Sequence, residues 1–159
     1  MTADEPEKLA KIVVDLPNHW AAAGEGLWAR DLGDGSYEIR NIPFHAYGLN
    51  LGDIVEASAE RPDLKPVVRR VVRSGGHRTL RVRFEKTVPE QTRLMLLRKR
   101  NRHKASFERG TDTYFAIDIE PDGDYDAVCK QLEIWLEKNL LAYETCEPRS
   151  EGRFDEGPS

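Results

Sequence analysis

The chain has 159 residues and a formal net charge of −4, with 39% hydrophobic and 33% charged residues. This composition excludes a polar chain unable to fold, and it fits one domain with its own core. The longest apolar runs, Trp20 to Ala23 and Leu94 to Leu97, are far shorter than the roughly 20 residues of a membrane helix, so no membrane segment is expected. The acidic segment Met1 to Lys8 lacks the features of a secretory signal, and we therefore expect a cytoplasmic protein.

The first third of the chain predicts β-strands. A β-branched run within Lys11 to Leu16 is typical of a strand, and the following proline ends it. Leu27 to Leu32 and Ser36 to Asn41 flank a Gly-Asp-Gly turn, and this arrangement predicts a β-hairpin. A tight turn at Gly52 then opens another expected strand.

Two further expected strands, Pro66 to Arg73 and Arg78 to Phe84, form a pair joined by a glycine-rich connection. Two glycines allow backbone N–H groups to turn toward a phosphate or carboxylate, and the neighbouring side chains add donors. An ordinary hairpin connection is the alternative interpretation. The candidate binding residues of this segment are Ser74, Gly75, Gly76, His77, Arg78 and Thr79.

The second half of the chain alternates between helical and strand patterns. Pro89 to Arg102 is rich in helix formers and ends in cations, which predicts a basic amphipathic helix. Thr111 to Glu120 alternates in polarity and predicts a strand with one apolar face. Tyr125 to Asn139 has a complete apolar stripe at helical spacing, with Asp124 placed as its N-cap. Leu140 to Thr145 is expected to return as a last strand.

These elements predict an α+β fold. A small curved sheet or half-open barrel is followed by a split β-α-β-α-β layer with two helices. We expect a single domain over residues 10–146, which is mainly β as far as residue 84. The polar ends, residues 1–9 and 147–159, are expected to be disordered because they offer nothing to pack.

The charge of the chain is concentrated in its middle. Between Lys65 and Arg109 there are fifteen basic and three acidic residues, a local net charge of +12, so the rest of the chain carries −16. A basic face of this kind, with Arg81 and Arg83 pointing outward, would attract an acidic protein or a nucleic acid. Neutralisation by the chain's own acidic segments is the alternative. The candidate contact residues on the basic helix are Arg98, Lys99 and Arg100.

An aromatic loop from Asn41 to Tyr47 holds one titratable group, His45. Its imidazole is a candidate base or ligand contact, or else the loop is a hydrophobic plug with the histidine hydrogen-bonded at its edge. The same ambiguity applies to Asp53, whose carboxylate is typical of a turn that satisfies its own amides. An enzymatic centre would need His45, Asp53, Ser74 and His77 to meet in one pocket.

Metal and cofactor chemistry has little support in the sequence. Cys129 and Cys146 form no Cys-x-x-Cys pair and have no histidines at zinc spacing. No Gly-x-Ser-x-Gly or His-Glu-x-x-His motif occurs. No cofactor, metal site or activated nucleophile is therefore predicted.

Four segments carry a resemblance to a known family. They are Leu27 to Arg30, Tyr37 to Phe44, Leu51 to Val55 and Arg73 to Thr79. Over about residues 11 to 145 the chain resembles a family of small bacterial proteins known only as a domain of unknown function. The resemblance implies a bacterial, cytoplasmic protein, and it implies no reaction, substrate or cofactor.

Three functional hypotheses follow from the sequence. The leading one is a non-catalytic binding or regulatory protein that engages an anionic partner through its basic middle and the segment Ser74 to Thr79. The second is an immunity-type protein that neutralises a cognate toxin, which co-purification with the product of a neighbouring gene would favour. The third is a small-molecule enzyme with a His/Asp/Ser site.

Overall fold

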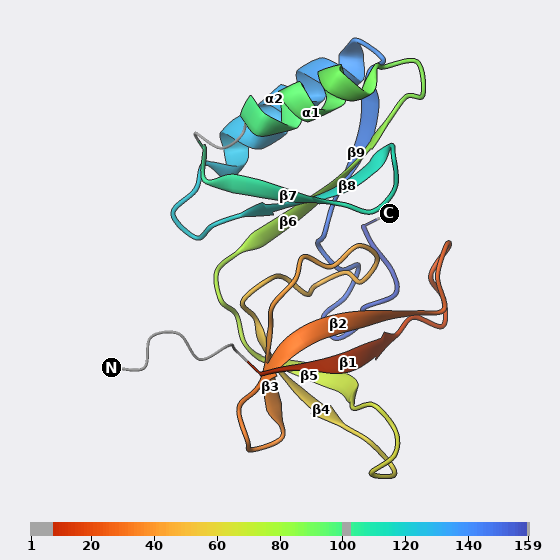
Figure 1. The fold of residues 1–159 in the computed structure, drawn as a ribbon, viewed down its shortest axis with the longest axis vertical. Helices are drawn as coiled ribbons and strands as arrows, with labels where there is room; N and C mark the ends of the chain where they lie inside the picture. The colour runs from red at the N-terminus through yellow and green to blue at the C-terminus, as the bar shows by residue number, and fades with distance from the viewer. Residues whose placement is uncertain (1–7, 100–102, 159) are drawn as a thin grey trace.

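The computed structural model describes residues 8–99 and 103–158, which form two sheets (Figure 1). A five-stranded curved sheet holds the first part of the chain, and a four-stranded sheet with helices on one face holds the second part (Figure 1). Together they give the α+β fold expected from the sequence. No helix in the described part of the chain is both long enough and apolar enough to cross a membrane.

The curved sheet is built from five consecutive strands. They are β1 (Leu9–Asp15), β2 (Gly24–Asp31), β3 (Ser36–Ile39), β4 (Ile54–Ser58) and β5 (Val67–Arg73). Neighbours along the chain pair antiparallel, and β1 meets β5 through a single parallel register pair, Val13 with Val67. The curvature encloses a core of β-branched and leucine side chains, among them Ile12, Leu27 and Val55, which are fully buried. The predicted small curved sheet is confirmed.

The predicted hairpin is present at β2 and β3. Its turn contains Gly33 and Gly35, with φ angles of 89° and 86°. Only glycine adopts this left-handed region without strain, so the Gly-Asp-Gly sequence determines where the chain reverses.

The second sheet belongs to a β-α-β-β-α-β unit. Its elements are β6 (Arg78–Phe84), α1 (Glu90–Arg98), β7 (Ala105–Arg109), β8 (Tyr114–Ile119), α2 (Tyr125–Glu137) and β9 (Leu141–Thr145). The strand order is β7-β8-β6-β9, and every neighbouring pair is antiparallel. The sequence does not predict strand β7, because this edge strand is mostly polar and only Ala105 is buried. The two-helix layer is otherwise as predicted.

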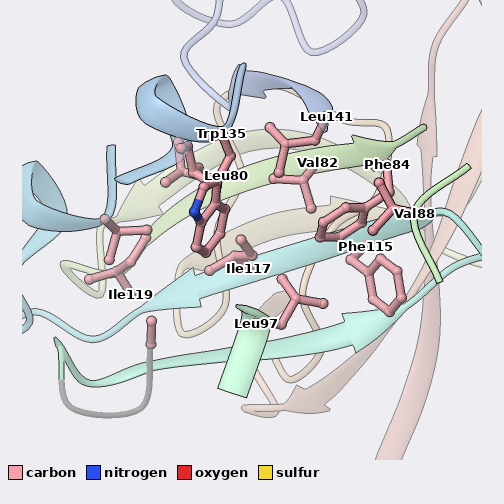
Figure 2. Packing of buried hydrophobic residues seen from close by; sticks show 13 residues of the cluster. Leu80, Val82, Phe84, Val88, Leu97, Phe115, Ile117, Ile119, Trp135 and Leu141 are labelled. Atoms are coloured by element: carbon pink, nitrogen blue, oxygen red, sulfur yellow. The ribbon is translucent and has the colours of Figure 1, made fainter. Parts of the chain in front are cut away.

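A continuous apolar core joins this sheet to its helices (Figure 2). Leu80, Val82 and Phe84 alternate along β6, so all three face the helices. Helix α2 contributes Trp135 from its apolar stripe, and Asp124 caps the helix by accepting a hydrogen bond from the backbone N–H of Ala127 at 3.0 Å. The predicted helix and its cap are therefore both present.

Strands β5 and β6 do not form the pair expected from the sequence. β5 pairs with β4 in the curved sheet, whereas β6 pairs with β8 and β9 in the other sheet. The segment Ser74 to His77 is thus a crossover between two sheets and not a hairpin turn. A glycine-rich link between two strand-like segments occurs in hairpins and in crossovers between sheets. The link itself does not determine which strand each segment pairs with.

The end of the chain packs more closely than its composition suggests. Phe154 lies against the core of the curved sheet, and its carbonyl accepts a hydrogen bond from the backbone N–H of Tyr47. The carboxylate of Asp155, 5% exposed, accepts two hydrogen bonds from Asn18, each 3.0 Å long. Residues 147–158 thus differ from the disordered tail that the sequence predicts, because one aromatic side chain and one buried carboxylate anchor them. At the other end, residues 1–7 lie outside the described part of the chain.

Candidate functional site

The crossover between the two sheets borders a hollow of about 410 Å³, which we call the loop pocket. Its charged side chains are those of Arg40, Arg73 and Glu38, and His77 adds an imidazole. Ser74 and Gly75 add a hydroxyl and a glycine backbone to its wall. Three of the predicted loop residues, Ser74, Gly75 and His77, therefore meet at one concave surface.

Asp53 ties this crossover to the curved sheet. Its carboxylate is 2% exposed and accepts hydrogen bonds from the backbone N–H groups of Gly75 and Asn50, each at 2.9 Å. Burial raises the pKa of the Asp53 carboxyl above its ordinary value, although these two N–H groups act in the opposite direction. The carboxylate satisfies backbone amides, as expected for a turn aspartate.

The close approach of two backbone segments explains one glycine of the crossover. A Cβ atom at Gly75 would lie 2.5 Å from the carbonyl oxygen of Gly52. Because both groups are backbone, neither can move aside cheaply. Glycine at position 75 therefore allows the crossover to pack directly on the turn before β4.

His77 is held from behind by a buried acid. Its Nδ1 lies 2.9 and 3.0 Å from the two carboxylate oxygens of Asp118, which is 2% exposed. Burial raises the pKa of the Asp118 carboxyl, and its hydrogen bond with His77 acts against that rise. The other edge of the imidazole lies against Gly52, where a Cβ would come within 3.1 Å of Cδ2. This pairing fixes the ring orientation at the wall of the loop pocket.

The remaining predicted loop residues face other neighbours. Arg78 donates to Glu147 at 3.1 Å and covers the ring of Tyr125, with Cζ 3.4 Å from the centroid. Thr79 is buried and donates its hydroxyl to Asn50 at 2.7 Å. Gly76 has a φ of 85° and packs against a proline of the β8–α2 turn. These three residues shape the crossover without lining the pocket.

Many central cations are paired with the chain's own acids. These pairs are Arg70 with Glu56, Arg78 with Glu147, Arg81 with Glu144, Lys104 with Asp122, and Arg109 with Glu90. Arg98 and Lys99 border a separate hollow of about 410 Å³ on α1, next to the half-exposed Met95, and Arg100 lies outside the described residues. Internal neutralisation therefore accounts for a substantial part of the central charge.

Arg81 corrects the predicted basic face. The sequence predicts that Arg81 points outward, but its side chain is buried, with 1% exposure. Side chains along β6 alternate between the two faces of the sheet as expected, so Arg81 does lie on the face away from the helices. That face is covered by residues 40–53, which we call the loop before β4. The carbonyls of Pro43 and Ala46 in this loop accept hydrogen bonds from Arg81 Nη1. A single sequence does not show that both faces of this sheet are covered.

His45 belongs to a different cluster of rings. It stacks on Tyr114 with a centroid distance of 6.2 Å and meets His19 edge-on at 5.5 Å. Ser74 and His77 line the loop pocket, but neither His45 nor Asp53 is among the residues that line it. The four-residue enzymatic centre considered from the sequence is therefore not assembled.

Two arginines of the loop pocket are not predicted from the sequence as binding residues. Arg40 follows β3 and Arg73 ends β5, so only the pairing of both strands with β4 brings them together. Arg73 is exposed, whereas Arg40 lies 3.8 Å from the Glu38 carboxylate. The residues are more than thirty positions apart, and no local spacing signals their meeting.

Replacing Tyr114 by phenylalanine provides a test of the packing around this ring cluster. Burial raises the pKa of Tyr114 from 10.0 to about 12, and its hydroxyl donates to the carbonyl of Phe44 at 2.6 Å. At neutral pH we expect the variant to be less stable by about 1 kcal/mol, because it loses this hydrogen bond.

The stability deficit of the variant should shrink as the pH rises. Between pH 10.0 and about 12 the unfolded chain ionises this tyrosine while the folded chain keeps it protonated, so rising pH removes stability from the wild type. Urea unfolding at a series of pH values measures the difference. A deficit that stays constant up to the highest pH would contradict the burial of this hydroxyl.

Comparison with known proteins places this architecture in a family. No curated protein matches the chain. A solved structure of a hypothetical protein from Neisseria gonorrhoeae is similar, with 21% sequence identity and a TM-score of 0.74 over 90% of this chain and 97% of that chain. This likeness shows a shared fold. A family model described as a domain of unknown function (DUF4265) matches residues 25–143, which confirms the resemblance noted in the sequence. Since that match spans well over half of the 159 residues, the chain belongs to the DUF4265 family.

Proposed function

We propose that this protein is a non-catalytic binding or regulatory protein that holds an anionic group of its partner in the loop pocket. The observation that carries the proposal is the meeting of Arg73, Arg40, Ser74 and His77 around one hollow of about 410 Å³. No carboxylate among the described residues forms an ion pair with Arg73, which is exposed. Its guanidinium is therefore available to a carboxylate from outside.

Rigid support of the pocket favours binding. Asp53 and Asp118 hold the crossover from two sides, through Gly75 and through His77. A ligand that enters a preformed site loses less conformational entropy than one that must order a loop. The pocket needs no rearrangement of its backbone to receive an anionic side chain.

An acidic protein surface fits this pocket better than a nucleic acid. No phenylalanine, tyrosine or tryptophan is among the described residues that line it, so it offers no large aromatic face for bases to stack on. Glu38 also lies in its wall, which disfavours a run of phosphates. A single carboxylate from a partner protein matches the exposed arginine more closely.

Reversing the charge at position 73 tests the proposal. We expect Arg73→Glu to weaken binding of a fluorescein-labelled oligoglutamate peptide about tenfold, because one attraction becomes a repulsion of similar size. Lys86→Glu is the matched control, since Lys86 is exposed between β6 and α1 and its reversal changes the net charge equally. Fluorescence anisotropy at low and physiological salt measures both variants.

Two outcomes would reject the loop pocket as the binding site. One is an equal weakening of peptide binding by Arg73→Glu and Lys86→Glu. This result would show that the effect comes from the net charge of the protein. The other is a large loss with the double variant Arg98→Glu and Lys99→Glu but none with Arg73→Glu, which would move the site to α1. A single-stranded oligonucleotide that binds more tightly than the peptide would replace the acidic protein as the partner.

A further inference from the structure

Another hollow lies against the sheet face opposite the helices. It has a volume of about 190 Å³, and we call it the arginine pocket. Arg81 and Arg83 from β6 contribute to its wall, together with Tyr114 of β8, Glu144 of β9 and Trp20 from the β1–β2 connection. Arg81 and Arg83 alternate with the core residues Leu80, Val82 and Phe84, which explains why both lie on this face.

The buried guanidinium of Arg81 is only partly satisfied. Its Nε donates to Glu144 at 3.1 Å, and its Nη1 donates to the carbonyls of Pro43 and Ala46 at 3.3 and 2.9 Å. Its Nη2 is buried and has no hydrogen-bond partner. A buried charged donor without a partner is costly, so a negative charge near this guanidinium would be favoured.

The acidic residue of this pocket, Glu144, already accepts hydrogen bonds from the protein itself. Glu144 accepts from Arg81 through Oε1 and from the Tyr47 hydroxyl through Oε2, at 3.1 and 2.7 Å. Arg83 lies over the ring of Tyr114 with Cζ 4.7 Å from the centroid, and no carboxylate of the described residues pairs with it. The pocket therefore contains two guanidinium groups against one carboxylate.

Trp20 adds a flat apolar surface beside these charges. Its side chain is 69% exposed, and its ring stacks on His19, which in turn stacks on Tyr47. A row of stacked rings holds the tryptophan in place although most of its surface faces solvent. Exposed tryptophans that are fixed in this way are typical of binding surfaces.

We propose that the arginine pocket binds a small monocarboxylate attached to a flat ring. The carboxylate pairs with the exposed guanidinium of Arg83, the buried charge of Arg81 adds an attraction without direct contact, and the ring packs against Trp20. The volume of about 190 Å³ suits a group smaller than the drug-sized ligands that fill pockets of roughly 300–1,000 Å³. Glu144 in the wall opposes a doubly charged phosphate.

The carboxylate has two potential sources, a free aromatic acid and the C-terminus of a peptide. A larger hollow of about 580 Å³ shares Trp20 and Glu144 with the arginine pocket and is bounded on its other side by the C-terminal segment. This neighbouring space would take the remainder of a peptide. The site is distinct in its residues from the loop pocket, so either site can fail without the other.

Titration of the isotope-labelled full chain with defined probes tests this site by nuclear magnetic resonance. Benzoate represents a free acid, and acetyl-glycyl-phenylalanine represents a peptide C-terminus. We expect saturable shifts of the Trp20 indole N–H and Arg83 Nε–H signals with at least one of them. Benzamide and the amidated peptide, which lack the charge, should bind at least about tenfold more weakly.

Variants at the exposed positions avoid the risk of unfolding that a change at Arg81 carries. Arg83→Gln should weaken binding of the acid about tenfold or more, and Trp20→Ala should weaken it severalfold. Lys86→Gln, which removes a charge elsewhere, should leave it unchanged. Tighter binding of the peptide than of benzoate would identify a C-terminus as the ligand. Equal binding of acid and amide, an unaffected Arg83→Gln variant, or no saturable shift with either acid would overturn the proposal.

Discussion

Replacing Phe115 by alanine is expected to lower the free energy of unfolding by about 3–5 kcal/mol, the usual cost of emptying a phenylalanine site in a core. Phe115 is fully buried at the centre of the four-stranded sheet, on its helix-covered face (Figure 2). Its ring meets Phe84 of β6 edge-to-face at 5.9 Å and Phe107 of β7 at 6.0 Å. Loss of the ring removes contacts with both neighbouring strands at once. Urea denaturation followed by circular dichroism measures the change.

Phe107→Ala is the matched control for this prediction. Phe107 is only partly buried and lies on the edge strand β7, so solvent fills part of the space that its ring leaves. Its loss should cost clearly less than that of Phe115, although both rings have the same size. Equal losses for the two variants would show that the core of this layer is not centred on β8.

Most of this layer could be predicted because its signals are local. The apolar stripe of α2 and its cap at Asp124 both lie within one stretch of sequence. Strand β8 was also expected, although all six of its residues are buried, because its polar members alternate with its apolar ones. Asp118 is one of those polar members, and its burial is possible because His77 pairs with it.

The contacts between the two sheets could not be predicted. Arg81 looks like a solvent-facing residue of an amphipathic strand, and only the loop before β4 turns that face into an interior. The glycines of the crossover allow tight backbone contact. No feature of the local sequence indicates that β5 and β6 belong to different sheets. Both candidate pockets lie at this junction or at its edge, which explains why Arg81 was expected on an exposed basic face and why Arg40 and Arg73 were not expected to meet.

A polar junction of this kind depends on complete hydrogen bonding. The carbonyl of Phe44 accepts from Tyr114, and those of Pro43 and Ala46 accept from Arg81, so the loop before β4 holds the second sheet through its acceptors. Its donors must be satisfied by another group. Glu25 on β2 has this role, because its carboxylate accepts from the backbone N–H groups of Phe44, His45 and Ala46 at 2.6, 2.9 and 2.8 Å.

Removing the Glu25 carboxylate is therefore expected to cost about 3 kcal/mol or more, because three backbone donors lose a charged acceptor near the interior. Glu25→Ala should lower the free energy of unfolding by this amount and accelerate amide hydrogen exchange at Phe44, His45 and Ala46. Glu25→Gln keeps one carbonyl oxygen and should have an intermediate effect. Glu137→Ala at the exposed end of α2 should change stability by less than about 0.5 kcal/mol. If Glu25→Ala matched this control, the loop would be held by its packing alone, and the buried arginine would not depend on Glu25 for the position of its acceptors.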